Sequence, residues 1–541
     1  MTGDAGGWLI TDRLFGVAER DGDRELVVDP VYGRFTYAEI AAQVERVAHG
    51  LREHGFGPGD VVILQLPNWT PFFVFHLALS VIGAVTGNIP FVYREREVGE
   101  ILRLTRARGL VVPGTCRGFD FGAMAAALAP EHASLERIFV VGGGVTVQGP
   151  KFVPYESLLR SPLGGESLDS LKPGLDDVTA LGFTSGTTGN LKGVVFDSNV
   201  LAAVNRGFIE RYSLDADDRI FACSPLGHAV GFTHALRMTL AIEGSMVLLE
   251  HWDADRALPA IHRERCTFMA AATPFLMDVV HHPDLARHER LPSLRLFLCG
   301  GASVPEKLMH DARRNLPHTF TSPLWGMTEC GGVTTCPFDA PADKLFTTDG
   351  LPCASMELKV VDADGAPLPP GADGELMARG PMVARGYIAQ PGLTEEHFLA
   401  DGFFRTGDQA RMDEDGYVKI TGRIKDLVIR GGVNISPVEI ENVLFSHPRV
   451  ANAAVVGMSD PRLGERACAF VVLAKGDSLA LEEVQRWMAR AGVARPKWPE
   501  RVETLDALPM TTSGKIQKFR LRERIAARLK QERQEQEQQA Q

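Results

Sequence analysis

The chain has 541 residues, of which 45% are hydrophobic and 23% are charged, and this composition is typical of a globular protein with several domains. Its formal net charge of −11, without a basic stripe, argues against a nucleic-acid partner. The eight scattered cysteines form no CxxC pair, which argues against a zinc site or a disulfide framework. The sequence indicates neither a signal peptide nor a membrane span, and together with the cysteine usage this predicts a cytoplasmic protein.

The first third of the chain alternates helical and strand patterns. Residues 36–55 carry apolar side chains at helical spacing, and residues 61–67 form a strand-like run after the turn FGPGD. Later apolar runs, such as RIFVVGGG and SLRLFLCGGASVP, break into glycine-rich turns. This alternation predicts an α/β fold with a largely parallel sheet, whose ligands bind beyond the carboxyl ends of the strands.

The pattern changes near Leu351. The stretch ELKVVDADGAPLPPGADGELMARGP predicts antiparallel hairpins or a small β-barrel, because it combines short strands with DG turns and prolines. Further on, the pattern predicts helices over residues 437–445 and 481–491 and strands in VANAAVVGM, ACAFVVLA and RVETLDALP. We therefore expect a large N-terminal domain over residues 1–424 and a small, mobile α+β domain over residues 425–541. The last twelve residues are expected to be a frayed helix or a disordered tail.

The stretch FTSGTTGNLKGV, residues 183–194, concentrates three glycines, four hydroxyl side chains and one lysine. Glycines bring backbone N–H groups close to a ligand, hydroxyls donate further hydrogen bonds, and Lys192 adds a compact positive charge. Such groups hold a polyanion, most plausibly the phosphates of a nucleotide. Leu191 and Gly193 exclude the Walker P-loop pattern, and from this window alone a flexible polar turn is the alternative.

Two acidic stretches have a functional and an ordinary interpretation. In PLWGMTE, Glu329 follows Thr328 and an aromatic residue, Trp325; it could hold Mg²⁺ next to phosphates or be a solvated surface acid. In FRTGD, Asp408 could accept hydrogen bonds from both hydroxyls of a ribose or be a simple turn residue.

Two basic stretches follow the same logic. GRIKDLVIRGG carries Arg423 and Lys425, and PMTTSGKIQK carries Lys515; a solvated basic loop is the ordinary interpretation of both. Each signal is weak by itself, yet all of them occur in one chain and in a definite order. Over residues 36–522 the set closely resembles the adenylate-forming superfamily, which comprises acyl-CoA synthetases, peptide-synthetase adenylation domains and luciferases.

The resemblance implies an ATP site and an acid site made from these motifs. The residues that would hold the phosphates of ATP are Thr184, Ser185, Gly186, Thr187, Thr188, Gly189, Lys192 and Thr328. Those around the adenine and ribose would be Gly300, Gly301, Ala302, Trp325, Gly326, Met327, Asp408 and Arg423. The metal ligands would be Thr184 and Glu329, and the acid pocket would contain His228, Val230, Phe232, Gly301 and Leu324.

The resemblance also implies the reaction of an AMP-forming acyl-CoA ligase that uses ATP, Mg²⁺ and coenzyme A. A carboxylate attacks the α-phosphate of ATP and expels pyrophosphate, and a thiol then attacks the acyl-adenylate and releases AMP. Because the attacking and attacked groups are both anions, the site must supply positive charge and alignment. The catalytic residues implied are Lys515, His228, Thr184 and Glu329.

The resemblance further implies that the two halves of the reaction need two domain arrangements. The small domain would rotate about Lys425, withdraw Lys515 and present the loop that contains Gly431 and Gly432.

The thiol and the acid depend on finer features. RGGVNISPVEIE and TSGKIQKFRLRE resemble the acyl-CoA synthetase versions of their motifs, and Ala229 stands where aryl-acid adenylating enzymes tend to place an asparagine that reads a 2-hydroxyl. QLPNW and YREREV resemble bacterial ligases for cyclic and aromatic acids, so the predicted substrate is a hydrophobic cyclic, aryl or medium-chain acid. The alternatives are an acyl-AMP ligase that loads a carrier-protein thiol and a non-catalytic nucleotide-binding interaction protein. The oligomeric state, including a homodimer, is left open.

Overall fold

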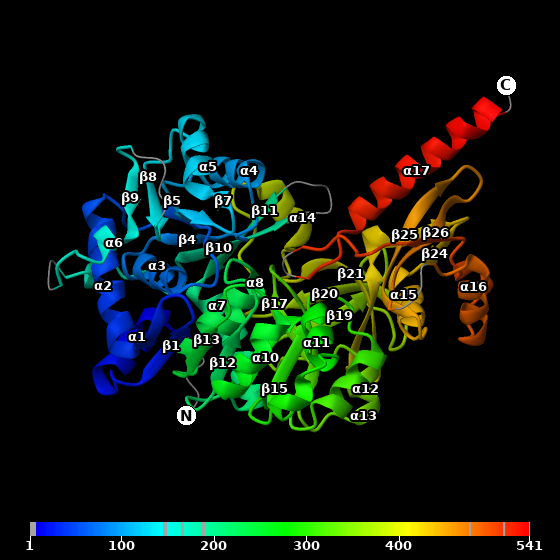
Figure 1. Ribbon diagram of the computed structural model, residues 1–541, viewed down its shortest axis with the longest axis horizontal. Coiled ribbons are helices and arrows are strands. Elements are labelled where there is room, and N and C mark those ends of the chain that lie inside the picture. The colour runs from blue at the N-terminus through cyan, green and yellow to red at the C-terminus, as the bar shows by residue number, and fades with distance from the viewer. Residues whose placement is uncertain are drawn as a thin grey trace.

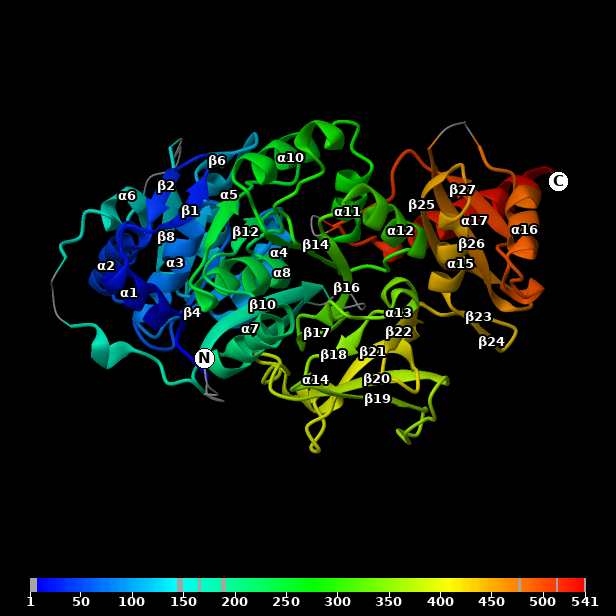
Figure 2. The same ribbon diagram turned by 90° about the horizontal axis from the view of Figure 1, so that it is seen from below.

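The computed structural model describes residues 7–143, 149–163, 167–185, 191–474, 478–511 and 514–539. Figure 1 shows a large body and a smaller unit at the C-terminal end of the chain, from which the last helix projects. The view from below in Figure 2 separates the same two parts along the long axis of the molecule.

The first sheet of the large body has seven strands in the order β11-β10-β4-β3-β5-β8-β9, and all of its pairs are parallel except β10 with β11. Its predicted first helix, α2 (Tyr37–Glu53), begins at a capping box in which Thr36 and Glu39 bond to each other's backbone N–H groups. The apolar helix α3 (Thr70–Val81) is buried along its whole length, as expected of a helix without a polar face. The strands are β3 (Val61–Leu64), β4 (Val85–Asn88), β5 (Gly109–Pro113), β8 (Arg137–Val141), β9 (Phe152–Pro154), β10 (Val178–Ser185) and β11 (Leu191–Asp197).

The second sheet has nine strands in the order β18-β17-β16-β15-β14-β12-β13-β1-β2, with a parallel centre and antiparallel strands at both edges. The helix α7 (Ser198–Tyr212) and a π-helical segment (Phe232–Arg237) pack near this sheet, and α11 (Thr273–Val280) and α12 (Glu306–Asn315) follow two of its strands. The strands are β1 (Glu25–Asp29), β2 (Gly33–Thr36), β12 (Arg219–Ala222), β13 (Ser245–Leu248), β14 (Phe268–Ala272), β15 (Leu296–Gly300), β16 (Phe320–Met327), β17 (Gly331–Thr335) and β18 (Leu351–Pro352).

The region after Leu351 forms an antiparallel sheet in which β19 (Glu357–Val361), β20 (Asp373–Arg379), β21 (Phe404–Met412) and β22 (Val418–Arg423) pair in that linear order. Of the two forms expected from the sequence, the described strands therefore make successive hairpins. The helix α14 (Pro391–His397) lies between β20 and β21 in the chain.

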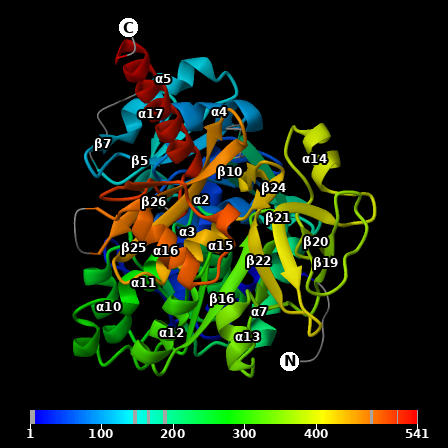
Figure 3. The same cartoon turned by 90° about the vertical axis from the view of Figure 1, so that its right-hand side faces the viewer.

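The small unit is a five-stranded sheet with its own two apolar clusters, one on each side. Figure 3 views the molecule from the side of this unit. The predicted elements of this region are confirmed: α15 (Pro437–Phe445), β25 (Val450–Asp460), β26 (Gly464–Leu473), α16 (Leu481–Arg490) and β27 (Arg501–Thr504). The remaining strands are β23 (Val428–Arg430) and β24 (Val433–Ile435), and the tail is a helix, α17 (Lys518–Gln539). The α/β class of the large body and the α+β class of the small unit are thus confirmed.

Candidate active site

Asp408 and Arg423 face each other on the paired strands β21 and β22. The indole Nε1 of Trp325 donates a hydrogen bond of 2.8 Å to Asp408 Oδ2, and Arg423 Nε lies 2.9 Å from Oδ1 in an ion pair. Oδ1 is buried but has no aligned hydrogen-bond donor among the described residues, so it retains acceptor capacity. The charge of Asp408 raises the pKa of Arg423 above its ordinary value. The structure thus brings together three residues that lie in three separate motifs.

Glu329 is buried just after β16, and the hydroxyl of Tyr387 donates a hydrogen bond of 2.9 Å to its Oε1. Lys192 lies on the other side of this tyrosine, with Nζ 4.9 Å from the ring centroid and 3.4 Å from Nε2 of His397. Burial lowers the pKa of Lys192, and the nearby charge of Glu329 opposes that effect. No sequence motif points to Tyr387 or His397, because both lie far along the chain from the groups that they contact.

The predicted phosphate loop joins β10 to β11. Thr184 and Lys192 are register partners on these antiparallel strands, so the loop begins and ends at one place. Gly186, Thr187, Thr188 and Gly189 lie outside the described residues, as does the side chain of Ser185.

The glycine-rich motifs of β15 and β16 lie side by side, because Gly300 is the register partner of Leu324. A Cβ atom on Gly300 would lie 2.2 Å from the carbonyl oxygen of Leu324, and one on Gly326 would lie 2.1 Å from that of Gly331. Only glycine allows this close approach. Next to these strands, the carbonyl of Ala302 accepts a hydrogen bond from Thr273, and Met327 ends β16.

Lys515 reaches this region from a loop of the small unit. Its Cε atom lies 3.6 Å from the position that a Cβ on Gly301 would take. Burial and the charge of Arg423 lower the pKa of Lys515, whereas the charges of Glu329 and Asp408 raise it. The lysine is therefore within electrostatic range of both buried acids.

The preceding residue, Gly514, seats this loop on the large body. Its φ is +77°, and a Cβ there would lie 3.0 Å from the Cβ of Ala272 and 3.3 Å from Pro274. A side chain at this position would push the two parts of the protein apart.

His228 caps the short helix α8 (Ala229–Gly231), and its Nδ1 accepts from the N–H of Val230 at 3.5 Å. Burial, with a smaller effect of the Lys515 charge, lowers the pKa of His228 to about 3, so the imidazole is neutral at neutral pH. Phe232 is buried at the start of the π-helical segment, and Leu324 is buried on β16.

The predicted hinge and loop residues lie at the surface. Lys425 is exposed in a short turn after β22, and its charge contributes to lowering the pKa of Lys192. Gly431 and Gly432 form the exposed turn between β23 and β24, with φ of +57° and +85°. The nearest neighbour of Gly431 is Leu463 of the small unit, so the structure does not bring this turn to the buried acids.

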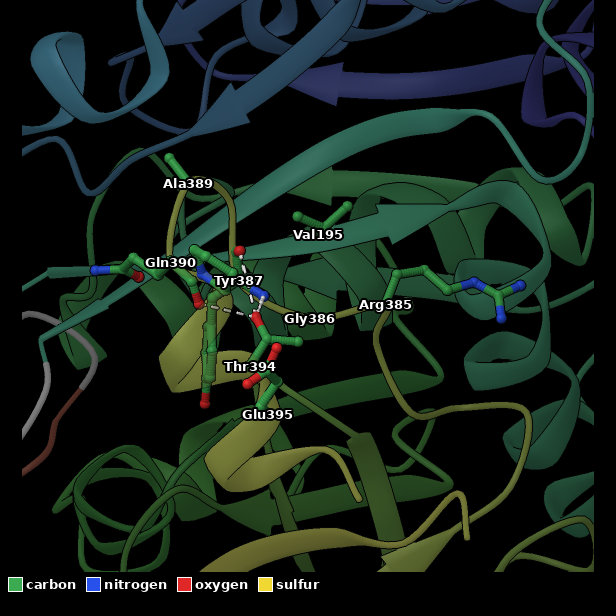
Figure 4. A pocket seen from close by; sticks show the side chains of 9 residues that line it. Val195, Arg385, Gly386, Tyr387, Ala389, Gln390, Thr394 and Glu395 are labelled. Carbon is green, nitrogen blue, oxygen red and sulfur yellow. Dashed lines mark hydrogen bonds between the residues drawn. The ribbon is translucent and has the colours of Figure 1, made fainter. Parts of the chain in front are cut away.

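A pocket of about 360 Å³ lies beside Tyr387, at the start of α14 (Figure 4). The N–H of Tyr387 donates to Thr394 Oγ1 at 3.0 Å, and Arg385 points away from the other side chains drawn. Neither Asp408 nor Lys515 lines this pocket. The pocket therefore borders Tyr387, which donates to Glu329, and does not border the group around Lys515.

The sequence profile of the AMP-binding enzyme family matches residues 14–388, and that of the AMP-binding enzyme C-terminal domain matches residues 439–515. A medium-chain fatty-acid–CoA ligase of Escherichia coli (strain K12) is 37% identical over 515 residues, which are 94% of this chain and 89% of that protein. A salicyl-AMP ligase / salicyl-S-ArCP synthetase of Mycobacterium tuberculosis is 34% identical over 522 residues, 93% of this chain and 88% of that one.

Solved structures give the same result. ATP-bound MatB from Rhodopseudomonas palustris is 29% identical and aligns with a TM-score of 0.83, covering 96% of this chain and 98% of that chain. Apo MatB aligns with a TM-score of only 0.73. The chain belongs to the AMP-binding enzyme family. Its class is that of the AMP-forming acid–thiol ligases, so the predicted enzyme class is confirmed and the non-catalytic alternative is set aside.

Two further observations concern metals and membranes. Within the described part of the chain, no group of three or more His, Cys, Asp or Glu side chains is placed to hold a metal ion. No helix among the described residues has both the length and the apolar character needed to cross a membrane.

Proposed function

We propose that the protein is an ATP-dependent carboxylic acid–CoA ligase. An acid and ATP give acyl-AMP and pyrophosphate, and acyl-AMP and coenzyme A then give acyl-CoA and AMP. The observation that carries the proposal is the position of Lys515, which comes from the small unit but lies beside Gly301, within electrostatic range of Glu329 and Asp408. The better match to ATP-bound than to apo MatB supports the view that this is the arrangement for the first half-reaction.

In that half-reaction the buried residues align ATP. The free capacity of Asp408 Oδ1 suits a ribose hydroxyl, while Trp325 holds Oδ2 in place. Lys515 supplies positive charge where the carboxylate attacks the α-phosphate, and fixed charge of this kind stabilises a transition state in which two anions meet.

The neutral His228 contributes a donor and not a charge. Its Nδ1 accepts from the Val230 N–H, so the proton resides on Nε2, which is free to donate to an oxygen of the substrate carboxylate. This interaction orients the acid and leaves it ionised as the nucleophile.

The residues present fit a magnesium ion held jointly with ATP. Tyr387 occupies only Oε1 of Glu329, and one carboxylate plus phosphate oxygens is a usual ligand set for Mg²⁺. Glu329 and the hydroxyl of Thr184 would be the protein ligands, and the bound ion would offset phosphate charge.

For the second half-reaction we propose that the small unit rotates about Lys425, removing Lys515 and bringing the turn of Gly431 and Gly432 to the adenylate. The exposure of all three hinge and turn residues supports this, since few contacts oppose their movement. Coenzyme A is the proposed acceptor, and a carrier-protein thiol is the alternative, because relatives of both kinds align over nearly the whole chain.

The proposed acid is hydrophobic, cyclic, aryl or medium-chain, since Phe232 and Leu324 are apolar and Ala229 offers no side-chain donor for an ortho-hydroxyl. The proposed compartment is the cytoplasm, which agrees with eight free, buried cysteines.

The experiment is a pyrophosphate-exchange assay with a panel of acids, followed by direct detection of thioester with free coenzyme A. Exchange with at least one acid and formation of its acyl-CoA are expected. Exchange without acyl-CoA for every activated acid would assign the carrier-protein reaction instead. No exchange with any acid of the panel would contradict adenylate formation.

A further inference from the structure

A buried arginine lies next to the proposed acid pocket and has no anionic partner in the part of the chain that the structure describes. The side chain of Arg237 is almost fully buried, at 1% exposure, and its Nε and Nη2 atoms have no hydrogen-bond partner among the described residues. Among the described residues, Nη1 alone of these nitrogens has a hydrogen-bond partner, Nε2 of His76 at 3.3 Å. No described Asp or Glu contributes to its electrostatics, and burial alone lowers its pKa, to about 9. A buried charge without compensation is strongly destabilising, so proteins seldom keep one without a function.

The contact with His76 does not compensate the charge. Arginine can only donate, so His76 Nε2 accepts, and the proton of the ring resides on Nδ1, which donates to Thr86 Oγ1 at 3.0 Å. Burial and the charge of Arg237 hold the pKa of His76 well below its usual range, so the imidazole is neutral. This Arg237–His76–Thr86 chain fixes the guanidinium and leaves two of its nitrogens free.

The position of Arg237 links it to the acid pocket. It ends the π-helical segment that starts at Phe232, and its guanidinium carbon lies 6.0 Å from the centroid of that phenyl ring. The ring of His76 packs on Phe232 as well, with centroids 4.8 Å apart. His228 caps the other end of this helical stretch, nine positions earlier in the chain. π-Helical turns inside helices are frequent at functional sites.

Neighbouring polar atoms are unpaired in the same way. On the same segment, Nδ1 of His234 has no partner among the described residues, and neither has Oδ1 of Asn205, whose amide donates to the Thr233 carbonyl. The ring of His234 packs on Phe208, and a Cβ on Gly332 would lie 2.7 Å from Phe208 and 3.0 Å from Leu324, so these two side chains approach the same glycine. The apolar walls proposed for the acid therefore end at a buried polar region.

We propose, on the basis of the function proposed above, that Arg237 binds an oxygen acceptor at the end of the acid remote from its reacting carboxylate. The substrate is then an acid with an apolar middle and a carboxylate or ketone oxygen at its far end. The free Nε and Nη2 atoms of the guanidinium are the donors. The oxygen of the substrate accepts from them, and no described residue does so.

The first test uses the wild-type enzyme alone. Pyrophosphate exchange is measured with octanoate, 7-oxooctanoate and suberate, and with shorter and longer members of the same three series. At one chain length, the oxygenated acids are expected to exceed the unsubstituted acid in kcat/KM by at least about ten-fold, the scale of one hydrogen bond to a charged group. The ketone and dicarboxylate series distinguish a neutral from an anionic acceptor.

The second test compares Arg237→Met with Met238→Leu, a volume-conserving change at the next position of the same helix. Arg237→Met should abolish the preference for oxygenated acids and retain activity with octanoate, whereas Met238→Leu should leave the preference unchanged. A thermal melt checks that each variant is folded. If Arg237→Met does not fold, the comparison of acids with the wild-type enzyme still tests the proposal.

Three results would overturn the inference. A wild-type enzyme that activates octanoate at least as well as its oxygenated analogues at every length contradicts it and leaves the ligase assignment intact. An equal loss for all acids in folded Arg237→Met assigns the arginine a structural role, with buried water as its partner. Absence of exchange with every acid contradicts the ligase itself, and this inference with it.

Discussion

The proposed nucleotide side and the proposed acid side of the site treat buried charge in opposite ways. On the nucleotide side, Asp408 and Glu329 each have one oxygen fixed by a neutral donor, Trp325 in one case and Tyr387 in the other. On the acid side, Arg237 is also buried, but among the described residues its one hydrogen-bond partner is a neutral histidine. ATP is the same ligand in every turnover, so the protein can pre-organise the carboxylates that bind it. In our proposal the acid is the ligand that varies, and it supplies the acceptor for the unpaired guanidinium of Arg237.

Lys515 comes from the small unit and is proposed to leave the site after the first half-reaction, and removing it should have the largest effect. Lys515→Ala is expected to lower the rate of adenylate formation by about 10²-fold or more, because a fixed charge at the reacting centre is lost. Pyrophosphate exchange measures this step. Thioester formation from pre-made acyl-adenylate should survive, and an equal loss in both half-reactions would contradict the assigned role.

The second-largest effect is expected for Asp408, on the proposed nucleotide side. Asp408→Ala is expected to weaken ATP binding by about 1.5–3 kcal/mol, the range for hydrogen bonds to a charged group. The apparent ATP affinity is measured at saturating acid. An Asp408→Asn variant keeps the shape, and unchanged affinity in both variants would leave Asp408 only a structural partner of Trp325 and Arg423.

The hydrogen bond that Tyr387 donates to Glu329 should matter less than the Glu329 carboxylate itself. Tyr387→Phe leaves Oε1 without its donor, so the carboxylate is no longer held in one orientation, and roughly ten-fold more Mg²⁺ should be needed for half-maximal exchange. Tyr417→Phe, a change at another largely buried tyrosine, serves as the matched control. Should the two variants require the same Mg²⁺ concentration, Tyr387 does not act through Glu329.

The smallest effect is expected in stability, on the acid side. Burial lowers the pKa of His234 to about 4, so its contribution is fully present above pH 6.5 and is lost as the pH falls towards 4. His234→Gln should therefore lose less stability than wild type over this interval, by at most about 3 kcal/mol, or about 3 °C in Tm for a chain of this length. Identical pH profiles of Tm would show that the histidine is not buried as a neutral ring.

Local patterns predicted the elements better than the contacts between them. The helix after Thr36 and the elements of the small unit follow from capping residues and periodicity, which are local properties of the chain. The pairing of Tyr387 with Glu329 spans 58 positions and that of Arg237 with His76 spans 161, and no short motif encodes either. Composition also left open whether the polar tail is a helix, and the structure continues α17 to Gln539.

The roles of the predicted site residues remain predictions, but the folding of the chain explains how such distant motifs can act together. Trp325 and Asp408 lie 83 positions apart, and they are joined because the fold brings these two positions of β16 and β21 together. The residue types in a motif thus limit the possible chemistry, while the sheet topology decides which motifs become neighbours.

The burial of all eight cysteines has a practical consequence. A thiol-reactive fluorophore will find no exposed native site, so cysteines introduced at the exposed Ala286 of the large body and Ala527 of α17 can be labelled selectively. Because α17 has 22 residues and extends about 33 Å, a dye on it would move farther than the body of the small unit in the proposed rotation. Energy transfer between the two dyes would then measure when the proposed rotation of the small unit occurs within a single turnover.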